Sequence, residues 1–152
     1  MISSPELPAT DYYSDKLLEE AARLYEHALE VVETNNFDFA TRAPIVDSLA
    51  EIYVKLGQLS RAEDLYKNVV SNYEFNDKLD QIGIAKSFSS YASLLENQNR
   101  LAEASKFFKR AFEVFQKYSV GSIDSQNCRS KYAALLRKLN LPDEAKKIEE
   151  SK

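Results

Sequence analysis

The chain has 152 residues, 44% hydrophobic and 29% charged, so it is long enough to bury the core of one soluble domain. Only three glycines and four prolines leave little room for loop-rich β structure, which favours helices. The net charge of −4 argues against nucleic acid as a partner, because surfaces that bind nucleic acid are basic. No apolar run approaches the about 20 residues of a membrane-spanning helix. We therefore expect no membrane insertion, and we expect no signal peptide at the start of the chain.

The first part of the chain is predicted to consist of an arm and one helix. Residues 1–14 contain two prolines and three serines without periodicity, which predicts an extended arm or linker or, alternatively, a disordered remnant of a longer protein. Ser14 is predicted to cap a helix that ends near Thr34. Apolar residues recur along this helix at helical spacing and form one stripe, namely Leu17, Leu18, Ala21, Leu24, Tyr25, Ala28, Leu29 and Val32.

Three helix pairs are predicted to follow. The first pair begins at 41–44, where Pro44 suits a first helical turn, and changes direction near Gly57, which we expect in the left-handed conformation. The remaining helices are predicted at about 59–76, 80–96, 101–118 and 124–139, with a short helix at the end of the chain that Asp143 caps. The sequence therefore predicts an all-α protein of about seven helices.

A repeat is visible in the register of the small residues. Ala21, Ala62, Ala104 and Ala145 fall 41, 42 and 41 residues apart. Bulky residues follow the first three of them four positions later, at Tyr25, Tyr66 and Phe108. In the preceding helices, Ala50, Ala92 and Ala133 are equivalent, as are Tyr53, Leu95 and Leu136. Small residues at fixed points with bulky ones one turn away are what serial packing of helix pairs requires.

This pattern resembles the tetratricopeptide repeat, with small–x–x–aromatic in the first helix and Ala–x–x–x–aromatic–x–x–Ala in the second. The segment 49–70 fits it best, and 91–114 nearly as well. The period of 41–42 residues resembles the long repeats of kinesin light chain. The resemblance implies a right-handed α-solenoid over residues 15–152, divided into repeats 15–40, 41–79, 80–122 and 123–152. An ordinary helical bundle with an accidental register is the alternative.

The two ends of the array depart from the repeat pattern. The first repeat is predicted to have only its second helix, because residues 1–14 show no helical pattern. The last repeat has Pro142 where leucine is expected and Glu149 in place of the aromatic residue. Such ends suit the caps of an array or a piece cut from a longer one.

No constellation of residues indicates catalysis. His27 is the only histidine and is predicted to be an exposed surface residue. Cys128 is predicted to be a small buried residue. With one histidine and one cysteine, no His/Cys metal cluster can form, and no phosphate-binding or nucleophile motif is present. We expect a protein that is not an enzyme and needs no cofactor and no metal.

The resemblance implies a groove lined by the first helix of each pair, where a peptide or helix of another protein would bind. The expected groove residues are Asp47, Glu51, Val54, Lys55, Lys86, Ser89, Ser90, Ser93, Glu96, Asn97, Asn127, Ser130, Lys131, Ala134, Arg137 and Lys138. In this order the groove would change from acidic through hydroxyl-rich to basic. Alternatively, these are solvated helix faces. Asp47 and Glu51 occupy the places where relatives clamp the carboxylate of a chaperone tail, so such a clamp is not expected here.

Two further roles are weighed against this scaffold or adaptor function. The chain could be a structural part of a larger solenoid, or it could self-associate through its unpaired first helix, where Leu17, Leu24 and Leu29 need cover. An enzyme is the third and weakest interpretation. The single Cys128 excludes an internal disulfide and fits a reducing compartment, so we expect the protein in the cytoplasm.

Overall fold

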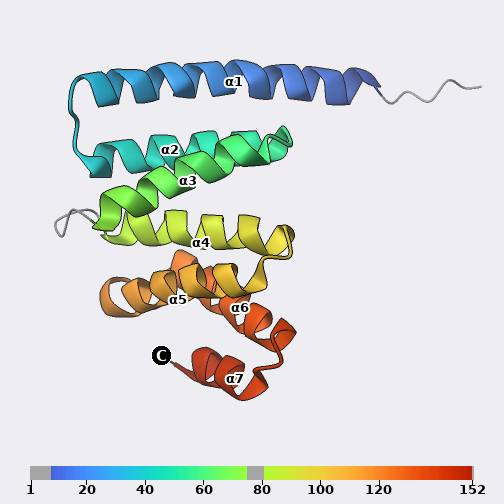
Figure 1. The fold of residues 1–152 in the computed structure, drawn as a ribbon, viewed down its shortest axis with the longest axis vertical. Helices are drawn as coiled ribbons and strands as arrows, with labels where there is room; N and C mark the ends of the chain where they lie inside the picture. Colours follow the sequence, from blue (N-terminus) through green and yellow to red (C-terminus); the bar gives the residue numbers. More distant parts are fainter. Residues whose placement is uncertain (1–7, 75–80, 152) are drawn as a thin grey trace, which may run out of the picture.

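The computed structural model describes residues 8–74 and 81–151, and these form seven helices and no strand. The helices are α1 (Pro8–Thr34), α2 (Phe39–Lys55), α3 (Leu59–Glu74), α4 (Gln81–Asn97), α5 (Leu101–Tyr118), α6 (Ile123–Lys138) and α7 (Pro142–Glu150). They are stacked in chain order from α1 at the top of Figure 1 to α7 at the bottom. The prediction of an all-α solenoid is confirmed. The helix pairs α4–α5 and α6–α7 lie within the predicted repeats 80–122 and 123–152, whereas the pair α2–α3 begins at Phe39, two residues before the predicted repeat 41–79.

The prediction of an extended arm is wrong for residues 8–14, which belong to α1. Pro8 is the first residue of this helix, a position where its missing N–H costs nothing and its fixed φ favours the helix. Pro8 therefore marks the start of a helix and does not indicate an extended arm. Ser14 lies inside α1 and does not cap it. Residues 1–7 of the predicted arm lie outside the described part of the chain.

Two other helix starts differ from the prediction, and a third, that of α6, lies where the sequence predicts but has a cap that the sequence did not assign. Asp38 caps α2, because its Oδ1 accepts a hydrogen bond of 2.9 Å from the Thr41 amide, and Pro44 consequently lies inside the helix. Ser122 caps α6 through the Ser125 amide at 3.1 Å. Asp143 does not cap α7, because Pro142 starts that helix and Asp143 falls in its first turn.

Four helices end in the same way, with a residue in the left-handed conformation. These residues are Asn36, Gly57, Asn99 and Asn140, with φ values of 53°, 74°, 58° and 60°. After α2, the amide of Gly57 bonds the Val54 carbonyl and the amide of Gln58 bonds the Tyr53 carbonyl, as in a Schellman motif. Asparagine tolerates this conformation better than most residues, which explains why it replaces glycine at the other three turns. The prediction for Gly57 is confirmed.

The small residues of the repeat let the paired helices approach closely. Ala50, Ala62, Ala92, Ala104, Ala133 and Ala145 are all fully buried, each 0% exposed. In α1 the buried alanine is Ala22, whereas Ala21, the residue in register, is only partly buried. Ala22 is the alanine that faces into the packed array, because α1 packs on α2 and has no first helix of its own among the described residues.

Candidate partner-binding groove

The first helices of the three complete repeats lie next to one another. α2 packs on α4 and α4 packs on α6, whereas α3 and α5, like α5 and α7, do not approach each other closely. Helices on the inside of a curved stack are closer together than those on the outside. The face formed by α2, α4 and α6 is therefore the candidate for the groove that the resemblance to tetratricopeptide repeats implies.

Two adjoining hollows of about 240 Å³ and 160 Å³ lie on this face. They share Glu51, Ser90 and Lys131, so they form one continuous depression, which we call the groove. The predicted residues that line it are Asp47, Glu51, Val54, Lys55, Lys86, Ser89, Ser90, Ser93, Asn97, Asn127 and Lys131. The structure thus brings most of the predicted set together.

Four further lining residues were not in the predicted set. Tyr66, Leu94 and Phe115 are at most 4% exposed and form the floor of the groove. The fourth, Asp124, lies one turn before Asn127 and two before Lys131. The spacing of these three residues along one face of α6 is a sequence signal that could have identified Asp124.

The remaining predicted residues do not line the two hollows. Glu96 and Lys138 form an ion pair of 2.6 Å between α4 and α6. Arg137 makes a bidentate ion pair with Glu149 of α7, at 2.5 Å and 2.7 Å. Ser130 and Ala134 are exposed on α6.

The expected order of charges from acidic to basic is wrong. Lys131 lines the same hollow as Asp47 and Glu51, and Lys86 lies 3.3 Å from Asp124. The other two basic residues at the expected basic end, Arg137 and Lys138, are paired with glutamates. Order along the chain does not translate into order along the groove, because the curve of the stack brings α2, α4 and α6 to one hollow.

Asp47 has the most perturbed carboxyl group of the groove. Its pKa is raised from the ordinary 3.8 to about 6, first by burial and then by the negative charge of Glu51, and against the hydrogen bond from Ser90 and the charge of Lys86. Its Oδ1 is buried and has no hydrogen-bond partner. Burial, followed by the charges of Asp47 and Glu51, also raises the pKa of Tyr66, which hydrogen-bonds Ser90. The groove therefore contains a destabilised negative charge beside small hydroxyl side chains.

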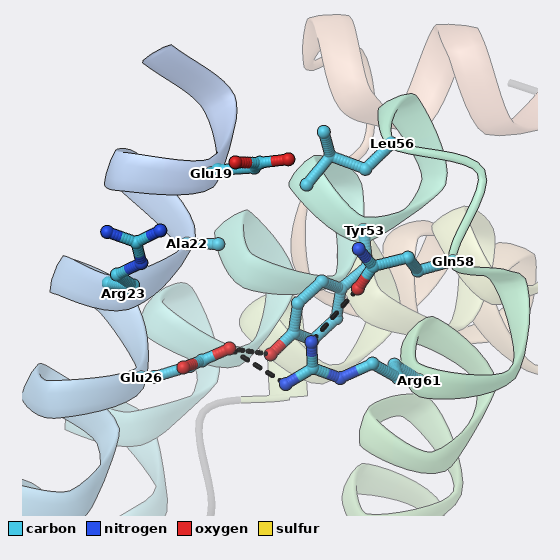
Figure 2. A pocket seen from close by; sticks show the side chains of 8 residues that line it. All are labelled: Glu19, Ala22, Arg23, Glu26, Tyr53, Leu56, Gln58 and Arg61. Atoms are coloured by element: carbon cyan, nitrogen blue, oxygen red, sulfur yellow. Dashed lines mark hydrogen bonds and ion pairs between the residues drawn. The ribbon is translucent and has the colours of Figure 1, made fainter. Parts of the chain in front are cut away.

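A third hollow, of about 200 Å³, lies between α1 and the turn that joins α2 to α3 (Figure 2). Its central group is Glu26, which accepts hydrogen bonds from the Tyr53 hydroxyl and, at 2.8 Å, from Arg61. The Arg61 guanidinium also stacks on the Tyr53 ring, 4.2 Å from its centroid. Burial and the bond to Glu26 raise the pKa of Tyr53 to about 12. These groups satisfy one another, so we interpret the hollow as a joint between repeats.

The same joint recurs one repeat further on. Glu63 of α3 accepts hydrogen bonds from the Tyr91 hydroxyl at 3.2 Å and from Arg100 at 2.8 Å. Lys67 adds an ion pair of 3.4 Å. Each joint thus links the second helix of one repeat to both helices of the next. The sequence register did not reveal it, because the glutamates Glu26 and Glu63 are not in equivalent positions.

His27 and Cys128, the two residues considered for catalysis, are exposed and buried, respectively, as the sequence predicts. His27 is exposed, 3.9 Å from Glu30. Cys128 is a free, buried thiol, and burial raises its pKa to about 11. Among the described residues, no three His, Cys, Asp or Glu side chains are placed to hold a metal ion together. Within the same part of the chain, no helix is both apolar enough and long enough to cross a membrane.

Comparison with protein families identifies two of the repeats. Residues 46–72 and residues 85–118 match two models that are both described as tetratricopeptide repeat. These segments contain most of α2–α3 and of α4–α5, so these two helix pairs match the tetratricopeptide repeat, as their residues predict. No curated protein sequence matches the chain.

The solved structures that are similar to this chain include proteins described as kinesin light chains. A putative kinesin light chain from Podosopora anserina with nearly identical TPR-like repeats is 16% identical, with a TM-score of 0.70, and the match covers 92% of this chain and 67% of that one. A point variant of that protein gives a TM-score of 0.71 at the same identity and coverage. BtubC (BKLC) from P. vanneervenii is 19% identical, with a TM-score of 0.69 and 86% of this chain covered. The chain matches only 52% of the length of BtubC. These structures therefore share the fold of this chain, a stack of TPR-like helix pairs.

Proposed function

We propose that this protein is a non-catalytic adaptor that binds an extended peptide or a helix of another protein in the groove formed by α2, α4 and α6. The observation that carries the proposal is the continuity of the two hollows over three successive repeats. Tetratricopeptide repeats are in general modules for protein–protein interaction, and the groove is where their first helices are accessible together. The compartment that we propose is the cytoplasm, which suits the free thiol of Cys128.

The chemistry of the groove indicates what kind of peptide it binds. Ser89, Ser90 and Ser93 have small side chains, so a peptide backbone can come close to α4 and exchange hydrogen bonds with their hydroxyl groups. Asp47 and Glu51 favour a basic side chain of the ligand, whereas Lys131 favours an acidic one close by. Charges of this kind set the orientation and the encounter rate of a ligand more than its affinity. A carboxylate-terminated chaperone tail remains unsuited to Asp47 and Glu51.

A selection from a random peptide library tests the proposal. Peptides selected on the wild-type protein should bind Ser90→Arg about tenfold more weakly or worse, because the long charged side chain fills the middle of the groove. Ser60→Arg on α3 is the matched control, since the same substitution at an exposed site outside the groove should leave affinity unchanged. Charge reversal of Asp47 and Glu51 together should weaken peptides that carry a basic residue. Circular dichroism verifies that all variants keep their helical content.

The proposal fails if the selected peptides bind Ser90→Arg as tightly as the wild type. A selection that yields no peptide specific for this protein overturns it as well. Loss of binding in Ser60→Arg but not in Ser90→Arg would move the site to the outer surface of the array.

Self-association is a second candidate function, favoured by the uncovered side of α1. Leu17 and Leu24 are 66% and 72% exposed, as an unpaired helix predicts. Leu29, the third residue expected to need cover, packs partly buried against the core instead, and Val31 is exposed in its place, at 42%. Large apolar side chains gathered on one helix face mark an interaction surface. Light scattering over a range of concentrations tests this function, and a strict monomer would exclude it.

A further inference from the structure

One face of α1 carries an alternation of large and small apolar residues. Leu17, Ala21, Leu24, Ala28 and Val31 follow one another at steps of four, three, four and three residues, and we call them the α1 stripe. This spacing keeps them on one side of the helix, as in the seam of a coiled coil. The three large residues are the exposed ones, whereas Ala21 and Ala28 are partly buried. A second helix could therefore lie along the whole stripe without displacing any part of the fold.

The internal repeat shows what normally covers this face. In register with Ala21, Leu24 and Ala28 are Ala62, Leu65 and Val69 of α3, and Ala104, Phe107 and Ala111 of α5. The four residues in register with Ala21 and Ala28 are 0% exposed. Phe107 packs on the rings of Phe88 and Tyr91, which belong to α4, the first helix of the same repeat. The α1 stripe is thus the surface where a second helix receives its first helix.

The α1 stripe also has a spacing that the first helices of the array share with the second helices, where it occurs at Ala62–Leu65 and Ala104–Phe107. First helices present a small residue followed three positions later by a large one, as in Ala50–Tyr53, Ala92–Leu95 and Ala133–Leu136. The α1 stripe contains this pattern twice, in Ala21–Leu24 and in Ala28–Val31. The α1 helix of a second copy can therefore take the place of the first helix that α1 lacks among the described residues. Each α1 then covers the stripe of the other.

We propose that two copies of this chain pair through their α1 stripes in antiparallel orientation, so that each α1 serves as the first helix for the α1 of the other copy. This inference rests on the second candidate function, self-association. Paired helices in the array are antiparallel, and this orientation lets Leu24 of each copy pack near the small Ala21 or Ala28 of the other. The interface has two-fold symmetry and closes on itself, so it gives dimers and no longer assemblies.

The charges beside the stripe favour the antiparallel orientation. Glu20 and His27 lie on one flank of the stripe, and in an antiparallel pair centred near Leu24 each Glu20 meets His27 of the other copy. A parallel pair would instead put the two copies of Glu20 on opposite flanks of the contact, so that Glu20 meets no His27. Glu19 and Glu26 take no part in the contact between the two copies, since both line the hollow on the side of α1 that faces the α2–α3 turn (Figure 2).

The size of the contact predicts a weak dimer. From residue 17 to residue 31 the helix rises about 21 Å, which is four turns. Interfaces of this kind are at the lower end of the sizes found for specific complexes, so we expect a dissociation constant in the micromolar range. Sedimentation equilibrium between about 5 and about 500 μM covers that range.

The first test is Leu24→Glu, which places a charge in the middle of the stripe. Because the side chain of Leu24 is 72% exposed, the variant should fold like the wild type, and it should remain monomeric where the wild type is dimeric. Ile123→Glu is the matched control, since Ile123 is 77% exposed on α6, far along the chain, and its replacement should leave the dimer intact. A wild-type dimer that Leu24→Glu does not dissociate would overturn the inference while self-association itself survives. A wild type that is monomeric throughout would overturn both.

The second test separates the two orientations by cross-linking with a short bis-maleimide. Native Cys128 is 1% exposed, so the wild type should give no product. In the antiparallel dimer, a mixture of Glu20→Cys and His27→Cys chains should give a cross-linked dimer, whereas neither variant alone should. A mixture that gives no cross-linked product at concentrations where the wild type is dimeric would refute the proposed orientation, because a parallel pair places residues 20 and 27 of the two copies on opposite flanks.

Discussion

Replacing Asp47 with asparagine should stabilise the protein at neutral pH. The pKa of Asp47 is raised from 3.8 to about 6, with burial as the main cause. Between these two values the folded protein binds a proton that the unfolded chain has released, so the free energy of unfolding falls as the pH rises. The stability that the protonated carboxyl contributes is complete below about pH 4 and is lost above about pH 6. The asparagine side chain is neutral at every pH and avoids this loss.

The magnitude follows from the size of the shift. A difference of about two pH units between the folded and unfolded pKa corresponds to roughly 3 kcal/mol in the free energy of unfolding. Asp47 is only partly buried, so solvent reduces this value, and we expect Asp47→Asn to gain about 1–2 kcal/mol at pH 7. The amide can still accept the hydrogen bond from Ser90. Asp47 also lines the groove, and stability is commonly sacrificed at binding sites.

Urea unfolding followed by circular dichroism between pH 4 and pH 7 measures this effect. The difference between Asp47→Asn and the wild type isolates Asp47 together with the charges coupled to it, because carboxylates outside the groove titrate alike in both proteins. That difference should be near its minimum at pH 4 and should grow up to about pH 7. Glu51→Gln is the companion variant: removal of its charge should lower the pKa of Asp47 and reduce the difference. An asparagine variant no more stable than the wild type at pH 7 would refute the reasoning.

Two further predictions concern the joints and the turns. Glu63→Gln should lower the free energy of unfolding by about 1–2 kcal/mol, because it removes the charged partner of Arg100 from a side chain only 14% exposed. Thermal unfolding would measure this loss, and Asp64→Asn, on the exposed side of the same helix, should change little. Asn99→Ala should cost about 1–2 kcal/mol because Asn99 has φ = 58°, whereas Asn99→Gly should be tolerated in the same assay. An alanine variant as stable as the glycine variant would contradict the role given to this turn.

Much of the fold could be predicted from local patterns. Helix spacing, the small residues of the repeat and the residues that end helices act over a few turns, so they are legible without tertiary contacts. The groove was also largely predictable, because residues such as Ser90 and Lys131 lie on the free face of helices whose other face carries the repeat pattern. The start of α1 was missed, since Pro8 is compatible with both an arm and a first helical turn.

The order of charges and the joints depended on the tertiary structure. Lys131 shares a hollow with Asp47 because the stack curves, and curvature arises from small rotations between repeats that no single helix encodes. Tyr53 meets Glu26 and Arg61 across two helix boundaries, which spacing along the chain does not specify. The sequence by itself determined the number, type and register of the helices, because these follow from local spacing. Only the packed array decided which charges are paired, which are buried, and which face of α1 is left uncovered.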